Sequence, residues 1–461
     1  MFALGAIAVI GAVLRLEAIG AHLSDAEGYS YLVGSAPSAG AFLHRLAAYE
    51  NTPPLFYLLL SALPLGHTAW LRVPAAVPGA LIPLVLYAAL RRPLGVRVAV
   101  LAAGMAAVAP FAVSYSDYAR GFMLEVLACM FALWAMLRLA QGDAPRWWWM
   151  YVVSGVVAVY SEYLAVSFLV ALTAAAVVYG RRDRLKTAAL GLLPLASLLP
   201  WLGQFERGQD ALNRTKTAPA FPGPSLSSLR DVTVRLVLGE HGAGAAEARR
   251  WLEFVAVLAV LTAALLVLRR GARARPEAAA TRAVRLIATT GALILAGSAL
   301  APLFGTEIFN ERYLTVLVPI GAALLAAAVG EVNTRRLWAA AAILVAVIAA
   351  AVFAQRYGRE YQPDLAPVRT AVESVHPRTV LTNSAVVAYY LRRMHVVVDR
   401  PFGLGPGLER SCASPCVIVD DSRVPGGVRP GPGPSKMVGP FDIRLSTYRR
   451  EAGRARAGYA K

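Results

Sequence analysis

The stretch RLWAAAAILVAVIAAAVFA, residues 336–354, decides the fold because Arg336 at its start is its only charged residue. About 20 mostly apolar residues in an α-helix are enough to cross a hydrocarbon core of roughly 30 Å. Apolar runs of similar length recur along the chain, which has 461 residues, 57% of them hydrophobic and only 16% charged. This composition is far from that of an ordinary soluble protein. We therefore predict a mainly α, polytopic transmembrane helical bundle.

Eleven membrane spans follow from the hydrophobic pattern, and clusters of Arg and Lys lie between alternate spans. Such clusters mark cytoplasmic loops. They also account for the formal net charge of +18 without nucleic acid, because no aromatic residues interleave with them. The clusters occupy residues 91–97, 138–146, 181–186, 269–275 and 335–336. The predicted spans lie near residues 2–21, 71–90, 97–113, 121–139, 147–160, 164–180, 187–203, 251–268, 285–304, 313–330 and 336–354.

Residues 53–70 test this count because they are almost long enough to cross the membrane. If they crossed, every later loop would change sides and the Arg clusters would lie outside, against the usual bias. We therefore interpret this segment as a re-entrant or interfacial helix. The count predicts a multi-pass membrane protein, with its acidic loops and its C-terminal region on the extracytoplasmic face.

Two domains are expected. Residues 1–355 form the transmembrane body, with outer-face loops at 22–70 and 204–250. Residues 356–461 are predicted to form a small extracytoplasmic α/β domain with a basic tail, because short apolar runs at 379–382, 395–398 and 416–419 are typical of buried strands. Cys412 and Cys416 could pair there only in an oxidising compartment.

Polar residues collect in the predicted outer loops. Two pairs of them, one acidic and one basic, each have a functional and a structural interpretation. Asp25 and Glu27 are either a general base with its orienting partner, or part of a helix start in which Ser24 or Asp25 is the N-cap and Glu27 lies in the first turn. Arg120 and Arg312 either bind phosphate or extend to lipid headgroups. The remaining candidates are Tyr29, Arg72, Asp117, Glu162 and Glu311.

Five motifs, taken in order, resemble those of the GT-C membrane glycosyltransferases. The closest branch is the bacterial one related to protein O-mannosyltransferases and lipid A aminoarabinose transferases. The chain departs from the family pattern because Ala26 separates the two acids, and because Asn51-Thr52 and Glu162 stand where His is frequent. After the acid cluster and Tyr29, the motifs are NTPPLFYLL (51–59), RVPA (72–75), SDYARG (116–121), YSEY (160–163) and ERYLTVLVP (311–319).

The resemblance implies an inverting glycosyltransferase of the bacterial cytoplasmic (inner) membrane. Such an enzyme moves a sugar from a polyprenyl-phosphate donor to an acceptor hydroxyl on a glycan, a lipid or a protein. Asp25 or Glu27 would be the base. Arg120 and Arg312 would hold the phosphate, and the other candidates would line the substrate site. No cofactor is predicted. A divalent metal stays an open alternative, which the sequence does not indicate because Asp117 lacks Asp-x-Asp spacing. The alternatives are a transporter or flippase of a lipid-linked saccharide, which needs no carboxylate base, and an inert glycan-binding relative.

Overall fold

The chain divides into two compact units in a computed structural model. The helical unit comprises residues 1–20, 51–209 and 218–359, and the sheet unit comprises residues 21–50, 210–217 and 360–461. Residues 21–50 therefore group with the C-terminal residues, which differs from the expected boundary near residue 355. The structure describes the whole chain except residues 1, 18, 22, 51, 181–182, 216–224, 240–246, 276–277, 302–309, 357–365, 375–376, 378, 383, 393–395, 399–415, 422–434, 439–440 and 447–461.

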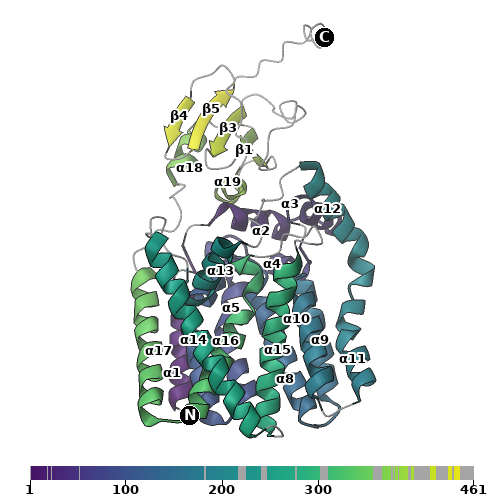
Figure 1. Cartoon of the computed structure of the whole chain (residues 1–461). Coiled ribbons are helices and arrows are strands. Elements are labelled where there is room, and N and C mark those ends of the chain that lie inside the picture. Colours follow the sequence, from purple (N-terminus) through teal and green to yellow (C-terminus); the bar gives the residue numbers. More distant parts are fainter. Residues whose placement is uncertain are drawn as a thin grey trace. The chain divides into compact units, whose positions relative to one another are not determined.

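The helical unit is a bundle whose long helices stand side by side (Figure 1). Helix α5 packs on α6 and α8, α8 packs on α9, and α10 packs on α15. The elements are α1 (Phe2–Leu16), α4 (Leu55–Ser61), α5 (Thr68–Leu90), α6 (Val96–Val108), α7 (Pro110–Ser116), α8 (Phe122–Ala140), α9 (Trp147–Ser161), α10 (Ala165–Tyr179), α11 (Arg184–Ala196), η1 (Leu199–Trp201), α12 (Leu202–Thr215), α13 (Leu226–Leu238), α14 (Glu247–Ala274), α15 (Ala279–Leu300), η3 (Glu311–Leu314), α16 (Leu317–Val332) and α17 (Arg335–Arg356).

Within the described ranges, six helices are long and apolar enough to cross a membrane. A seventh span arises if α6 and α7, which meet at a bend of 57°, are counted together. Three shorter apolar helices, α1, α10 and α16, accompany them. Helix α4 has seven residues, about 10 Å of helix, and is too short to cross. The eleven predicted spans thus correspond to fewer full-length helices and several short ones.

The bend between α6 and α7 has a local cause. Pro110 has no N–H to continue the helical ladder, and it disfavours helical geometry at Ala109, whose φ and ψ are −59° and 115°. The break leaves the carbonyl of Ala107 in the last turn of α6, where no intrahelical donor follows. The guanidinium of Arg15 donates to this carbonyl from Nη1 at 2.9 Å. A buried arginine of α1 therefore supplies a hydrogen-bond donor to this carbonyl at the break.

The sheet unit holds a five-stranded mixed sheet in the order β2-β1-β3-β5-β4. Strand β1 is parallel to both neighbours, with Val380 opposite Val396 on β2 and Val417 on β3. Strand β5 is antiparallel to β3 and β4. Cys416 begins β3, whereas Cys412 lies outside the described residues. The elements are α2 (Asp25–Gly34), α3 (Ala39–Tyr49), α18 (Ala366–Glu373), β1 (Thr379–Thr382), α19 (Ala385–Tyr390), β2 (Val396–Val398), β3 (Cys416–Asp421), β4 (Ser435–Val438) and β5 (Phe441–Ser446).

Helix α2, which begins at Asp25, packs against α19 from the C-terminal part of the chain. Their backbones meet at Gly28, where a Cβ atom would lie 2.3 Å from the amide nitrogen of Val386. Beside this contact the rings of Tyr31 and Tyr389 pack edge to face at 5.1 Å. The helix that carries the two candidate acids is therefore supported by the C-terminal residues.

Candidate functional site

Helix α2 starts with a complete capping box. The amide and the hydroxyl of Ser24, the N-cap residue, each donate to Oε2 of Glu27 at 2.9 Å, and the hydroxyl of Ser24 accepts from the amide of Glu27. Glu27 is only 2% exposed. Of the two interpretations given above, the structure supports helix capping for Glu27. Asp25 occupies the first helical position, and its side chain lies outside the described part of the structure.

Tyr29, on the same helix, is buried and its ring stacks on that of Tyr49 at 5.6 Å. This contact joins α2 to α3. Tyr29 was predicted to contact substrate, and the structure places its ring in an aromatic pair that holds two helices of the sheet unit together.

In the helical unit, two of the motifs meet through a hydrogen bond. Nη1 of Arg120, in the turn between α7 and α8, donates to the hydroxyl of Tyr57 on α4 at 3.1 Å. The hydroxyl of Thr52 donates to the same oxygen at 3.1 Å. Tyr57 is fully buried, so it provides a fixed acceptor that orients the guanidinium. Asn51, the first residue of this motif, lies outside the described residues.

A third motif packs directly against the Arg120 turn. Glu162 ends α9 and is 6% exposed. A Cβ atom added to Gly121 would lie 2.5 Å from the carbonyl oxygen of Ser161 and 3.2 Å from Oε1 of Glu162. Glycine at this position therefore lets the two turns approach, and it brings the Glu162 carboxylate to the residue next to Arg120.

The motif at residues 311–319 joins the same group through Tyr313 in η3. Burial raises the pKa of the Tyr313 hydroxyl. Of the charged groups that act on this pKa, Arg312 lowers it, Glu162 raises it and Arg120 lowers it. The three charges thus act on one hydroxyl. We call Tyr57, Arg120, Glu162, Arg312 and Tyr313 the arginine cluster; all five lie in the helical unit.

Glu311 precedes the second arginine of the cluster and is engaged elsewhere. Its Oε1 accepts a hydrogen bond from Nη1 of Arg235 on α13 at 2.8 Å, and Glu311 is 6% exposed. Asn310 caps η3 by accepting from the amide of Arg312 at 3.1 Å. Sequence reasoning missed Arg235, because α13 lies in a polar loop that matches none of the motifs.

Two other predicted residues lie at helix ends. Arg72, on α5, is 4% exposed and its Nη1 donates to the carbonyl of Ile19 at 3.4 Å, so it holds the chain that follows α1. Its predicted place among the residues that line the substrate site stays a prediction. Asp117 is half-buried and ends α7, where its amide donates to the carbonyl of Ser114.

Among the described residues, no group of three or more His, Cys, Asp or Glu side chains is arranged to hold a metal ion. The charged residues of the cluster are two arginines and one glutamate. Such an excess of positive charge suits an anion, and guanidinium groups match the oxygens of a phosphate.

Comparison with known proteins identifies the architecture. A family model described as dolichyl-phosphate-mannose-protein mannosyltransferase matches residues 51–202, which include three of the motifs that form the cluster. ArnT from Cupriavidus metallidurans in the apo state has a TM-score of 0.61 and 13% identity, with 92% of each chain covered. The chain has the fold of the GT-C membrane glycosyltransferases. The predicted resemblance to this superfamily is therefore confirmed at the level of the fold, and six of the described helices are long and apolar enough to cross a membrane.

Two further GT-C structures contain lipid phosphates. ArnT from C. metallidurans bound to undecaprenyl phosphate has a TM-score of 0.51 and 16% identity, covering 76% of this chain and 63% of that one. The oligosaccharyltransferase AglB from Archaeoglobus fulgidus, in complex with an inhibitory peptide and a dolichol-phosphate, has a TM-score of 0.51 and 13% identity, covering 91% and 69%. No curated protein matches the chain. At these identities the likeness establishes the fold alone.

Proposed function

We propose that this protein is an inverting glycosyltransferase of the bacterial inner membrane, which takes a sugar from a polyprenyl-phosphate donor and passes it to an acceptor hydroxyl on the extracytoplasmic face. The observation that carries the proposal is the arginine cluster, in which Arg120 is oriented by Tyr57 and shares the surroundings of Tyr313 with Arg312. The lipid phosphates bound to ArnT and AglB support a donor of this class.

The two arginines of the cluster stabilise the negative charge of the leaving group. When the bond between the anomeric carbon and the phosphate oxygen breaks, its electron pair leaves on the phosphate, whose negative charge increases. Arg120 and Arg312 donate charge-assisted hydrogen bonds to this phosphate, and these bonds strengthen as the charge develops. Because the departing phosphate is stabilised in this way, it needs no proton. Glu162, whose carboxylate lies beside Gly121, limits the excess positive charge of the cluster.

The acceptor hydroxyl has to lose its proton as its oxygen bonds to the anomeric carbon, so a base is required. We assign this role to Asp25, because Glu27 is committed to the capping box of α2. A single displacement, in which the base takes the acceptor's proton while the phosphate leaves with the electron pair, gives inversion. Glu27 acts as a positioning residue by holding the start of α2.

The proposal is tested with the full-length protein in lipid nanodiscs and radiolabelled polyprenyl-phosphate sugars. Release of polyprenyl phosphate and labelling of an acceptor glycan, lipid or protein are expected, with Asp25→Asn reducing kcat by about two orders of magnitude or more. Translocation of the donor across vesicle membranes, unchanged in Asp25→Asn and without any sugar transfer, would instead establish a flippase. Binding of glycan with neither transfer nor translocation would establish an inert relative.

A further inference from the structure

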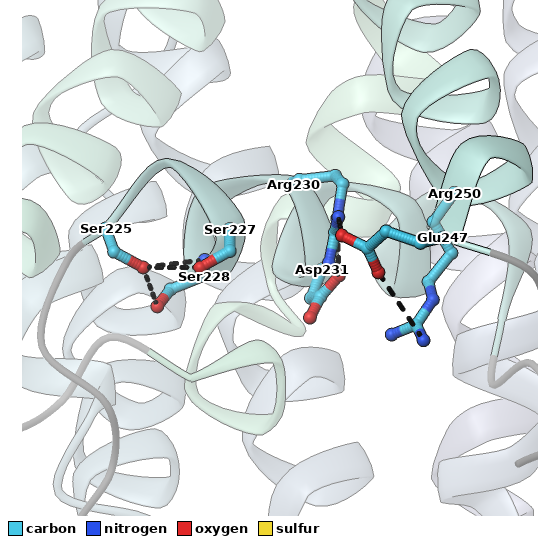
Figure 2. A network of polar contacts seen from close by, with 7 residues as sticks. All are labelled: Ser225, Ser227, Ser228, Arg230, Asp231, Glu247 and Arg250. Atoms are coloured by element: carbon cyan, nitrogen blue, oxygen red, sulfur yellow. Dashed lines mark hydrogen bonds and ion pairs between the residues drawn. The ribbon is translucent and has the colours of Figure 1, made fainter.

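Helix α13 contacts neighbouring helices at both of its ends. Near its start Arg230, which is 3% exposed, forms ion pairs with Asp231 and with Glu247 at the start of α14 (Figure 2). The Arg230 guanidinium also lies over the ring of Trp251, 4.7 Å from its centroid. After its last residue, Gly239 has φ +85° and packs against Pro110, the first residue of α7. Helix α13 therefore has little freedom to shift relative to α14 and α7.

The start of α13 is capped as well. The hydroxyl of Ser225 accepts from the amide of Ser228 at 3.0 Å and lies 2.7 Å from its hydroxyl, as Figure 2 shows. Capping of this kind stabilises a helix end by about 1 kcal/mol in general. An ordered, anchored helix is a suitable support for a residue that has to hold another element in place.

Between these anchors, α13 presents Arg235 to Glu311 of η3, and the residue next to Glu311 is Arg312 of the arginine cluster. We propose that the Arg235–Glu311 ion pair, the strap pair, positions Arg312 to bind the lipid phosphate of the donor. The inference rests on the proposed function and adds Arg235 to it as a positioning residue. It also gives Glu311 a role that does not require contact with substrate.

The strap pair has two effects on phosphate binding, one of charge and one of position. They predict opposite changes in phosphate affinity when the Glu311 carboxylate is removed. Glu311 carries a negative charge next to Arg312, and by Coulomb's law alone its removal should tighten the binding of a phosphate. Its carboxylate is nevertheless the group through which α13 holds η3, with 8% of its side chain exposed. If position matters more than charge, loss of the carboxylate weakens phosphate binding. The variant Glu311→Gln therefore decides between the two effects.

The experiment measures binding of a polyprenyl monophosphate to the full-length protein in nanodiscs. Glu311→Gln, Arg235→Gln and the charge-reversing Arg235→Glu and Glu311→Arg are each expected to weaken binding by about tenfold. The double variant Arg235→Glu/Glu311→Arg restores the pair with its charges exchanged and is expected to recover most of the affinity. Recovery is expected only if the two residues act through their ion pair. If each residue were needed independently, the double variant would bind no better than the single reversals.

A matched control pair exists at the other end of α16. Arg275, which directly follows α14, and Glu331 of α16 also form an ion pair of 2.8 Å. The 16 residues of α16, about 24 Å of helix, separate this end from η3. The same reversals there should leave lipid-phosphate affinity within twofold, and thermal unfolding shows which variants remain folded. Where a reversal prevents folding, the milder Gln variants decide the result.

Two results would overturn the strap pair. If Glu311→Gln binds the lipid phosphate as tightly as the wild type or more tightly, charge dominates and the pair does not position Arg312. If the wild type binds and the exchanged double variant is no better than the single reversals, Arg235 does not act through Glu311. Either result leaves the proposed function intact, whereas a wild-type protein that binds no polyprenyl monophosphate would refute both proposals.

Discussion

Arg15 of α1 donates from Nε to the hydroxyl of Ser116 at the end of α7, at 3.0 Å and across 101 residues of sequence. The same guanidinium donates from Nη1 to the carbonyls of Gly11 and Ala107, each at 2.9 Å. Helix α5 closes the site from another side, because a Cβ atom on Gly79 would lie 2.1 Å from the Ser116 hydroxyl. One buried arginine thus fixes the segment that leads from the break after α6 to Arg120.

We expect Arg15→Met to lower the free energy of unfolding by about 3 kcal/mol, because the Ala107 carbonyl and the Ser116 hydroxyl lose a charged donor inside a low-dielectric bundle. Arg15→Lys should recover only part of this loss, since a single ammonium does not span the same acceptors. Unfolding in detergent mixtures gives the measurement. Arg336→Met, at an exposed helix start, is the control and should change stability by less than about 0.5 kcal/mol; equal losses for both variants would contradict the assignment.

Gly28→Ala tests the contact between α2 and α19. The added methyl group would lie 2.3 Å from the Val386 amide nitrogen, so the two backbones have to separate at a cost of about 2 kcal/mol. Gly40→Ala is the matched control on α3, because nothing lies within 4 Å of a Cβ there and alanine favours the helix. We expect Gly28→Ala, and not Gly40→Ala, to increase proteolysis of the sheet unit and to reduce sugar transfer. Equal resistance to protease in both variants would show that the contact is not needed.

The hydrophobic pattern of the sequence predicted helices in the right regions, and the order of motifs predicted the fold. It predicted a single span over residues 97–113 and did not predict the bend at Pro110. Mean hydropathy over a segment is insensitive to one residue that interrupts the helical hydrogen-bond ladder. Strand β5 has the period of two that is typical of strands, since Phe441, Ile443 and Leu445 alternate with polar residues. That signal was present in the sequence, but the three strand segments predicted for this region did not include it.

Other features had no local signal. The contact of α2 with α19 joins residues from near the two ends of the chain, and it depends on Gly28 having no side chain. Arg235 is one of 46 Lys and Arg residues, and only the fold shows that it faces Glu311. The capping box of Glu27 could be foreseen from Ser24 three residues earlier, but the sequence could not decide between capping and catalysis.

Tyr57→Phe tests the orientation of Arg120. The variant keeps the buried ring and removes the oxygen that accepts from Arg120 and from Thr52. We expect the affinity for a polyprenyl monophosphate to fall about tenfold, as the loss of a hydrogen bond to a charged group implies, with little change in thermal stability. Tyr179→Phe removes a hydroxyl that accepts from Thr289 and serves as the control. An unchanged affinity in Tyr57→Phe would show that Arg120 does not depend on this hydrogen bond for phosphate binding.

Asp25→Asn and Glu27→Gln separate the two acids of α2. If Asp25 is the base, Asp25→Asn lowers kcat without weakening donor binding, because an amide cannot accept the acceptor's proton. Glu27→Gln keeps an oxygen that can accept from Ser24 and is expected to retain most of kcat, whereas Glu27→Ala loses the cap and about 1 kcal/mol of stability. Steady-state kinetics with donor and acceptor varied, together with thermal unfolding, provide the comparison. A larger loss of kcat in Glu27→Gln than in Asp25→Asn would reverse the two assignments and make the capping carboxylate the base.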